Sequence, residues 1–369
     1  MTQKHNILLT NQAKQPKLNS NDVPCDGIVE VRAHMRGGVP VRAYTRSCGY
    51  HPPHSQDQMV SSDFKINRQT AYMTRKLLKP ILEQVIELAN HGNQLFLDIM
   101  RDKMKHVYGC LEEAISLIGR GSIYVRSPGK MSPQEIAEHT EKLIEVSVDD
   151  IFMQEGFIPY PYLDTKAKKT IGVGHLVDKN DPDMKLFRMQ NGRVGAEITD
   201  ESEKRACFQR MEDAAKLYTK TIIDPKTGKE DYICTTLPSR QEAMKNLGFG
   251  WSETYAREVL KQDIETKIRD IRDHVATLGL EFFDLPLAQQ RVLLDCRFNM
   301  GSHFTLSLEK RTSKTRSWPK FTRHMLDHSI IGMMNEIQSN DVAERRNLWR
   351  QAVLALAQLE TWEKTYEFQ

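Results

Sequence analysis

The sequence predicts an α+β protein that is mostly α-helical and carries a small antiparallel sheet. Apolar residues recur every three or four positions between residues 64 and 147, which is the periodicity of amphipathic helices. Glycines and β-branched residues alternate around Thr170 and Val173, which indicates short strands. After Glu253 the chain has helical periodicity almost throughout. Its 369 residues allow one to three domains with a sizeable core.

Composition excludes several classes of protein. The mean hydropathy is −0.54 and no run of eighteen apolar residues is present, so no transmembrane segment is predicted. The net charge of +3 at pH 7 is too small to indicate a nucleic-acid partner, but it suits an anionic polymer such as a cell wall. The first ten residues have too short an apolar run for a signal peptide, so synthesis in the cytoplasm is expected.

The cysteines and histidines indicate neither a disulfide framework nor a metal site. No C-x-x-C pair occurs, so free thiols are predicted. His175 has no second histidine or cysteine at ligand spacing. The sequence therefore predicts no metal and no cofactor. The six cysteines are Cys25, Cys48, Cys110, Cys207, Cys234 and Cys296.

Residues 1–62 are expected to form a flexible N-terminal segment, because they are rich in polar residues and lack apolar periodicity. A short Val-Arg-Ala repeat begins at Val31 and again at Val41, with Gly37-Gly38 between the two copies. Such a pattern is compatible with a small β-hairpin. Two interpretations stand side by side: a docking peptide for a partner surface, or a basic tail without a specific role.

Residues 63–147 are expected to form a helical N-terminal domain. One helix is predicted around residues 77–86, with Pro80 as a kink or restart, and a longer one over residues 96–118. Ser132-Pro-Gln-Glu135 is a capping-box start for a third helix. The apolar stripes of these helices need a partner, so a small bundle or a cap on the next domain is expected.

Residues 148–369 are expected to form a second domain. It should open with a short helix that carries Glu155 near its end, followed by the small sheet. Apolar positions expected in its central and last helices are Val292, Leu293, Cys296, Phe298, Met300, Leu348, Val353, Leu356 and Leu359.

Glu155, Asp164 and Thr170 are the candidate catalytic residues. Two carboxylates nine positions apart are followed by a hydroxyl, and the run continues into Ile-Gly-Val-Gly-His175. Most glycoside hydrolases need one carboxylic acid to protonate the leaving oxygen and one carboxylate to activate water or attack the sugar. Taken singly, the three residues could also be a helix-end charge, a turn residue and a strand former.

The complete string from Glu155 to His175 resembles the active-site segment of phage-type lysozymes, glycoside hydrolase family 24. Four later segments resemble family elements in the same order: Ala256-Arg-Glu-Val-Leu-Lys-Gln-Asp263, Arg297-Phe-Asn-Met-Gly301, Arg345-Arg346 and Thr361-Trp-Glu-Lys-Thr-Tyr366. The resemblance covers roughly residues 148–180 and 252–369, and it does not reach residues 1–145.

The resemblance implies a two-lobed lysozyme-like domain and a muramidase that inverts the anomeric carbon. Glu155 would be the general acid, and its partial burial should favour the protonated form. Asp164 would be the ionised partner and Thr170 would orient the attacking water. The resemblance also implies that Arg345 or Arg346 lies beside Glu155.

The resemblance also implies that a helix ends at Asp263 and that this aspartate pairs with His175. An alternative register starts the partner helix near Ile198 and places Arg210 at the position of the aspartate. Because an arginine cannot pair with a protonated histidine, the Asp263 register is favoured. It leaves residues 181–250 as an insert, in which a helix-like run from Ser202 to Tyr218 and a turn at residues 224–229 are predicted. The insert could lengthen the cleft, gate it or bind a partner.

The expected partner is peptidoglycan, degraded in the periplasm or outside the cell after export, lysis or injection. Residues 1–147 would dock the enzyme on a phage particle or a secretion machine, and an effector of this kind would require an immunity or inhibitor protein. A second hypothesis is a non-catalytic peptidoglycan-binding or structural module built on a lysozyme-like domain.

Overall fold

The computed structural model of the protein divides into two units, residues 1–61 and 62–369, which are described separately. It is mostly helical with small antiparallel sheets, so the α+β class is confirmed. The residues that the structure describes are 28–31, 34–36, 39–41, 44–47, 62–91, 94–118, 131–164, 167–177, 183–223, 230–234, 238–301, 304–308, 318–339 and 343–366.

The first unit contains two antiparallel strand pairs. β2 pairs antiparallel with β3, with Arg36 opposite Val39, as the predicted hairpin requires. A second pair joins β1 to β4, with Val31 opposite Tyr44. The flexibility expected for the rest of residues 1–62 falls on residues outside those described. The strands are β1 (Ile28–Val31), β2 (His34–Arg36), β3 (Val39–Val41) and β4 (Tyr44–Ser47).

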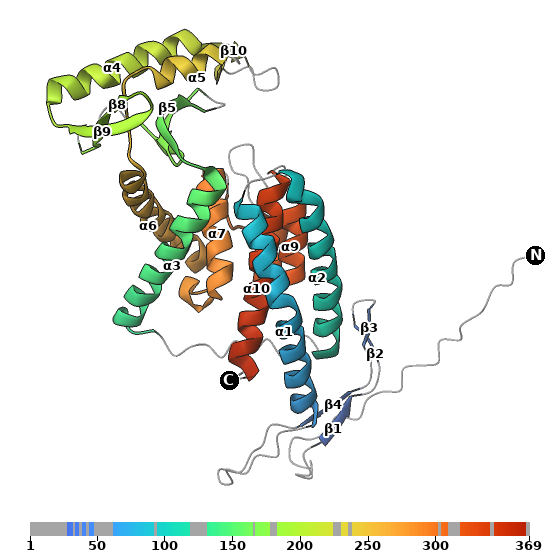
Figure 1. Ribbon diagram of the computed structural model, residues 1–369. Helices are drawn as coiled ribbons and strands as arrows, with labels where there is room; N and C mark the ends of the chain where they lie inside the picture. The colour runs from blue at the N-terminus through green and yellow to red at the C-terminus, as the bar shows by residue number, and fades with distance from the viewer. Residues whose placement is uncertain are drawn as a thin grey trace, which may run out of the picture. The chain divides into compact units, whose positions relative to one another are not determined.

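The second unit begins with helices that bury one apolar face each. Leu78, Leu82 and Val85 are 0% exposed, and α1 continues through Pro80 instead of restarting there. α2 matches the predicted longer helix to within a residue. Both helices lie beside α10, the last helix of the chain (Figure 1). These elements are α1 (Ser62–Asn90), η1 (Gln94–Phe96), α2 (Leu97–Ile118) and α10 (Glu344–Tyr366).

α3 (Pro133–Glu155) corrects the expectation of a short helix at residue 148. It starts at the predicted capping box, in which the Ser132 hydroxyl accepts from the Glu135 backbone and the Glu135 side chain accepts from the Ser132 backbone. No glycine or proline interrupts the chain between Pro133 and Glu155, so the capped start and the Glu155 end belong to one helix.

Two three-stranded antiparallel sheets follow α3. β5 pairs with β6 and β6 with β7, and a separate sheet has the order β12-β8-β9. The backbone N–H of Trp251 donates to the carbonyl of Pro159 over 2.8 Å, which joins the two sheets. The strands are β5 (Ile158–Leu163), β6 (Lys169–Gly172), β7 (His175–Leu176), β8 (Leu186–Gln190), β9 (Arg193–Ile198) and β12 (Phe249–Gly250).

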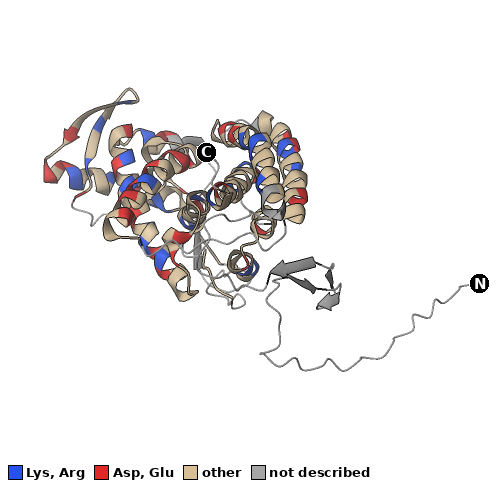
Figure 2. Ribbon diagram, turned by 90° about the horizontal axis from the view of Figure 1, so that it is seen from below, with Lys and Arg blue, Asp and Glu red and all other residues tan. Residues whose placement is uncertain are grey.

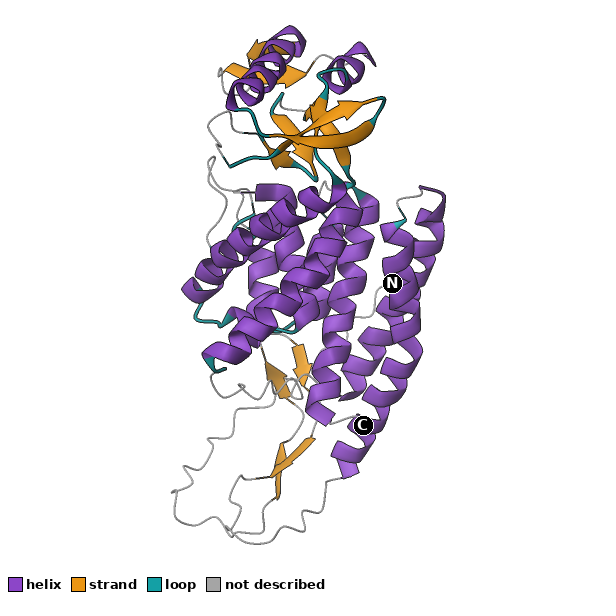
Figure 3. Ribbon diagram, turned by 60° about the vertical axis from the view of Figure 1, so that its left-hand side comes forward, coloured by secondary structure: helices purple, strands orange, loops and turns teal. Residues whose placement is uncertain are grey.

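The expected insert, residues 181–250, supplies most of the elements around these sheets. Figures 1 and 3 show the strands together with α4 and α5 at one end of the helices. The predicted helical run at 202–218 is present as α4, whereas the predicted turn at 224–229 lies outside the described residues. Besides β8, β9 and β12, the insert contains α4 (Glu201–Tyr218), β10 (Thr219–Ile223), β11 (Glu230–Cys234) and α5 (Pro238–Lys245).

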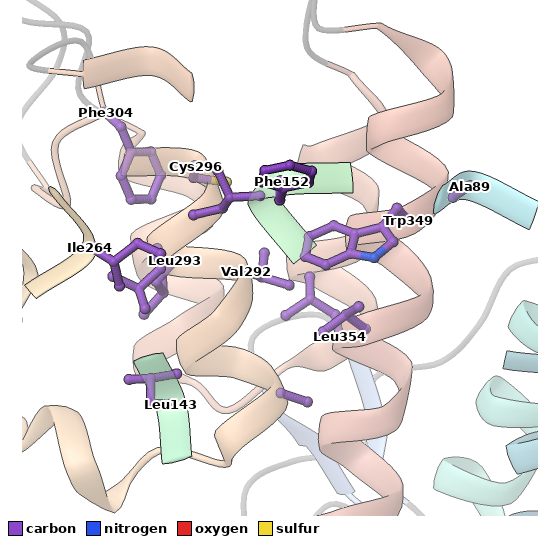
Figure 4. Close-up of a cluster of buried hydrophobic side chains, with 14 of the residues drawn as sticks. Ala89, Leu143, Phe152, Ile264, Val292, Leu293, Cys296, Phe304, Trp349 and Leu354 are labelled. Carbon is purple, nitrogen blue, oxygen red and sulfur yellow. The ribbon is translucent and has the colours of Figure 1, made fainter. Parts of the chain in front are cut away.

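The helical core centres on α7 and α10. Val292 and Leu293 of α7 and Trp349 and Leu354 of α10 are all 0% exposed (Figure 4). Burial of these side chains supplies the main driving force for packing the helices together. The remaining elements are α6 (Glu253–Thr277), η3 (Phe282–Asp284), α7 (Leu287–Met300), α8 (Pro319–Leu326) and α9 (Ile330–Gln338).

The expected division between residues 63–147 and 148–369 does not separate two compact units. Residue 147 lies inside α3, and the apolar stripes of α1 and α2 are covered by α10. The chain therefore returns after more than 200 residues to bury its first helices, and residues 62–369 form one unit.

Charges and thiols complete the description. Basic and acidic residues are interspersed over the helices (Figure 2). Within the described ranges, no helix is long and apolar enough to cross a membrane. Three cysteines in those ranges are free thiols: Cys110, Cys207 and Cys296.

Candidate active site

Glu155 is the last residue of α3, and the chain turns at once into the first sheet. Gly156 has φ 76° and ψ 165°, a conformation open essentially to glycine alone. Nη1 of Arg346 donates to Oε1 of Glu155 over 2.6 Å, and the Glu155 side chain is 26% exposed. Of the two arginines offered by the sequence, Arg346 therefore makes the ion pair.

Arg345 contacts backbone carbonyl groups instead of Glu155. Nη2 of Arg345 donates to the carbonyl of Gln154 over 3.2 Å, and Nη1 donates to the carbonyl of Ala89. The Gln154 side chain in turn donates to Oδ1 of Asn90 over 2.9 Å. Burial, together with the charge of Arg346, lowers the pKa of Arg345. These contacts tie the end of α1 to the residue that precedes Glu155.

Behind Arg346 lies a buried carboxylate, Asp295, that the sequence analysis missed. Nη2 of Arg346 donates to Oδ1 of Asp295 over 2.6 Å, and Nε of Arg350 donates to Oδ2 over 2.6 Å. Burial would raise the pKa of Asp295, but the two guanidinium groups hold it below its usual value. An acidic residue within the apolar run of α7, and arginines four apart on α10, are the signals that could have found this cluster.

Asp164 and Thr170 lie on either side of the turn between β5 and β6. The backbone N–H of Lys168 donates to Oδ1 of Asp164 over 2.8 Å, and the Thr170 hydroxyl donates to the carbonyl of Lys168 over 3.1 Å. Thr170 is 3% exposed. Because its proton is already used, the hydroxyl oxygen is left as an acceptor.

Tyr162 connects the two candidate carboxylates. It lies opposite Thr170 in the β5–β6 register. Burial raises the pKa of Tyr162 to about 12, and the negative charges of Glu155 and Asp164 add to the effect. Both carboxylates are thus close enough to one phenol to affect its ionisation.

His175 and Asp263 form the expected contact, with 2.8 Å between Nδ1 and Oδ2. Trp251 packs beside the histidine, with 5.3 Å between ring centroids. Arg210, which the alternative register would have paired with His175, instead donates to the sulfur of Cys207. Asp263 lies in the middle of α6, whereas the resemblance placed it at a helix end.

A groove runs along α3 and α6, apart from the candidate catalytic residues. Its apolar floor includes Ile144 and Val148, and charged residues such as Asp149, Arg257 and Glu258 line its sides. In the part of the chain that the structure describes, no group of three or more His, Cys, Asp or Glu side chains gathers as a metal site would require.

Comparisons of the chain with protein-family models, with curated proteins and with solved structures found no match. Any functional assignment must therefore be made from the chemistry of the residues above.

Proposed function

We propose that the protein is a muramidase, a glycoside hydrolase that cleaves the β-1,4 bond between N-acetylmuramic acid and N-acetylglucosamine in peptidoglycan. The observation that carries the proposal is the turn in which Lys168 joins Asp164 to Thr170, in the strand pair that follows Glu155 at the end of α3. The resemblance of the same string to phage-type lysozymes supports the choice of substrate.

In the proposed reaction, Glu155 is the general acid. It gives its proton to the glycosidic oxygen while the bond from that oxygen to the anomeric carbon breaks. A water molecule forms the new bond to that carbon and passes a proton to Asp164. One bond breaks and one forms, and Asp164 later returns its proton through solvent to Glu155.

Thr170 suits the placement of that water. Its hydroxyl proton is directed to the Lys168 carbonyl, so its oxygen can accept one proton of the water while Asp164 accepts the other. A water held by two acceptors keeps a lone pair for attack on the sugar. Attack from the face opposite Glu155 inverts the anomeric carbon.

The proposed substrate cleft lies where the end of α3 meets β5 and β6. A lysozyme-like division would assign the helices around α7 and α10 to one lobe and the sheets with α4 and α5 to the other. Residues 181–250 would then form much of the smaller lobe and set how many sugars are bound.

Reducing-end analysis of digested peptidoglycan tests the proposal. Wild type should release fragments that end in N-acetylmuramic acid, and Glu155→Gln should lose at least about 100-fold in rate, because general acid catalysis contributes on that order. Glu141→Gln, an exposed carboxylate on the same helix, is the matched control and should keep its rate. Full activity in Glu155→Gln would contradict the proposal, and glycan binding without any product would favour the non-catalytic module.

The first unit, residues 1–61, is proposed to deliver or dock the enzyme. Its strands form two antiparallel pairs, and the Val-Arg-Ala repeat of the sequence offers arginines to a partner surface. Deleting residues 1–61 should leave the rate on purified walls unchanged, because the deletion follows the boundary between the units. Loss of wall digestion in that variant would show that the segment belongs to the enzyme itself.

A further inference from the structure

Glu155 stands at the exposed end of a row of alternating charges that passes into the core. Arg346 follows it, then Asp295, then Arg350, each within 2.6 Å of the next. The exposed fraction of the side chain falls along the row, from 26% for Glu155 to 7% for Arg346, 1% for Asp295 and 0% for Arg350. Three helices contribute: α3, α7 and α10.

The charge of Arg346 conflicts with the proposed role of Glu155 as a proton donor. A guanidinium 2.6 Å from a carboxylate favours the ionised form, whereas a general acid must hold a proton. The attraction is strongest where little water screens it, and Arg346 is almost fully buried. An arginine with no other counter-charge would therefore compete directly with the proposed role of Glu155.

Asp295 takes up much of that charge. Nε of Arg346 lies 3.1 Å from both Asp295 oxygens and Nη2 lies 2.6 Å from one, while only Nη1 is directed to Glu155. Burial opposes charge on both partners, but their mutual attraction keeps Asp295 ionised and raises the pKa of Arg346 above its usual value. Glu155 thus faces a cation whose charge a buried anion offsets in part, since Asp295 is shared between Arg346 and Arg350.

Other charged or titratable groups surround Glu155 or the row behind it. α1 contributes uncharged groups, the carbonyl of Ala89 and the amide of Asn90. Asp150 pairs with Arg291 over 2.7 and 2.9 Å and so forms a separate neutral couple. Among the residues that the structure describes, these groups are Arg345, Arg346 and Arg350 from α10, Asp295, Cys296 and Arg291 from α7, Asp150 from α3, and Tyr162 and Asp164 from β5 and the turn after it.

We propose that Asp295 is a positioning residue for Glu155: it fixes Arg346 in place and offsets part of its charge, so that Arg346 holds Glu155 at the end of α3 without exerting its full charge on that carboxyl. The inference rests on the proposed general-acid role of Glu155. The electrostatic part does not require a particular substrate.

Asp295→Asn tests the proposal, because it keeps the shape and one acceptor oxygen but removes the charge. Glu155 should then titrate at lower pH, and the alkaline limb of the pH profile of kcat/KM should move down by about one unit. Above that limb the rate should fall about tenfold. A ¹³C NMR titration of the glutamate carboxyls, assigned by the signal missing in Glu155→Gln, should show the same displacement without any substrate.

Arg350→Gln supplies a test of opposite sign. It removes the second cation on Asp295 and leaves that carboxylate more fully to Arg346, so Glu155 should titrate at higher pH. Asp150→Asn is the matched control, since it neutralises another buried carboxylate that pairs with Arg291 instead of Arg346. It should lower the Tm but leave the Glu155 titration in place.

The outcomes separate this inference from the proposed function. Opposite displacements of the Glu155 signal in Asp295→Asn and Arg350→Gln support the inference even if wild type digests no wall, in which case the muramidase proposal alone fails. An unmoved Glu155 signal in Asp295→Asn overturns the inference, even if activity falls. Equal displacement in Asp150→Asn also overturns it, because the effect would then belong to any buried charge.

Discussion

Asp164 and Thr170 are joined through a single residue, since the backbone of Lys168 donates to the Asp164 carboxylate and accepts from the Thr170 hydroxyl. The turn between β5 and β6 therefore orients both side chains at once. A carboxylate and a hydroxyl oxygen are held as a pair of acceptors, and neither depends on a long side chain that would have to be ordered when substrate binds.

Replacing the Thr170 hydroxyl should affect rate more than stability. Thr170→Val keeps the shape but loses the acceptor, so wall digestion should slow by about 100-fold, the order expected when one catalytic hydrogen-bonding group is removed. Loss of the bond to Lys168 should cost only about 1 kcal/mol. Thr170→Ser should stay within about tenfold of wild type, since it retains the oxygen. Initial rates of reducing-end release, with folding checked by circular dichroism, measure the difference; equal rates for the valine and serine variants would exclude the proposed role.

Leu77 and Leu78 provide a matched pair for testing whether α1 belongs to the main unit. Leu78 is 0% exposed and Leu77 is 51% exposed. Leu78→Ala should cost about 2–5 kcal/mol, whereas Leu77→Ala should cost less than about 0.5 kcal/mol. Because α10 covers α1, thermal unfolding of the Leu78 variant should show one transition, shifted as a whole. Two transitions with only the first shifted would restore the division into separate domains.

Glu360 should make stability depend on pH in a defined direction. Its carboxylate accepts from the Ala288 backbone over 3.3 Å, and burial raises its pKa above the usual 4.5 despite that bond. The folded protein thus binds the proton more tightly than the unfolded chain. The resulting stabilisation is complete below the unfolded pKa and is lost as the pH rises through the folded pKa.

Glu360→Gln removes the buried charge and keeps an acceptor for Ala288. We therefore expect a higher Tm than wild type at pH 7, and a difference that disappears near about pH 4. A series of thermal scans across this range measures it, with the exposed Glu141→Gln as control. A wild-type Tm equal to or above that of the glutamine variant at pH 7 would contradict the expectation.

Gly172 and Gly174 both need a backbone conformation that favours glycine, but only Gly172 also lacks room for a side chain. Both have positive φ, 67° and 78°, so alanine at either position should cost about 1–2 kcal/mol. At Gly172 an added Cβ would also lie 2.7 Å from Cε3 of Trp251, whereas at Gly174 the nearest atom, in Phe298, is 3.9 Å away. Gly172→Ala should therefore lose about 1–3 kcal/mol more than Gly174→Ala in urea unfolding. Equal losses would mean that Trp251 moves aside freely.

Local signals predicted much of the fold. The capping box at Ser132 predicted the first residue of α3, and the Gly37-Gly38 pair predicted that the strands on either side of it would pair. The ends of helices were less predictable where no glycine or proline interrupts the sequence. α6 continues past Asp263 to Thr277 because its first glycine, Gly279, comes only after the helix has ended.

Long-range pairing explains what the sequence could not predict. The apolar stripe of α1 predicted that another helix covers it, but it could not identify that helix. The helix is α10, which lies more than 200 residues further along the chain. Arg345 and Arg346 were both candidates for Glu155, and only the rotation of α10 selects Arg346. Asp295 was missed because its neighbours along the chain are apolar and both of its cations come from another helix.

The position of Gly156 has a dynamic consequence. Glu155 is fastened to the helices through Arg346, whereas Asp164 and Thr170 belong to the sheet, and Gly156 is the first residue between them. A glycine without side-chain contacts is a natural pivot, and no atom lies within 4 Å of where its Cβ would be. Bending at Gly156 would change the separation of the two carboxylates, the distance on which an inverting or a retaining outcome depends.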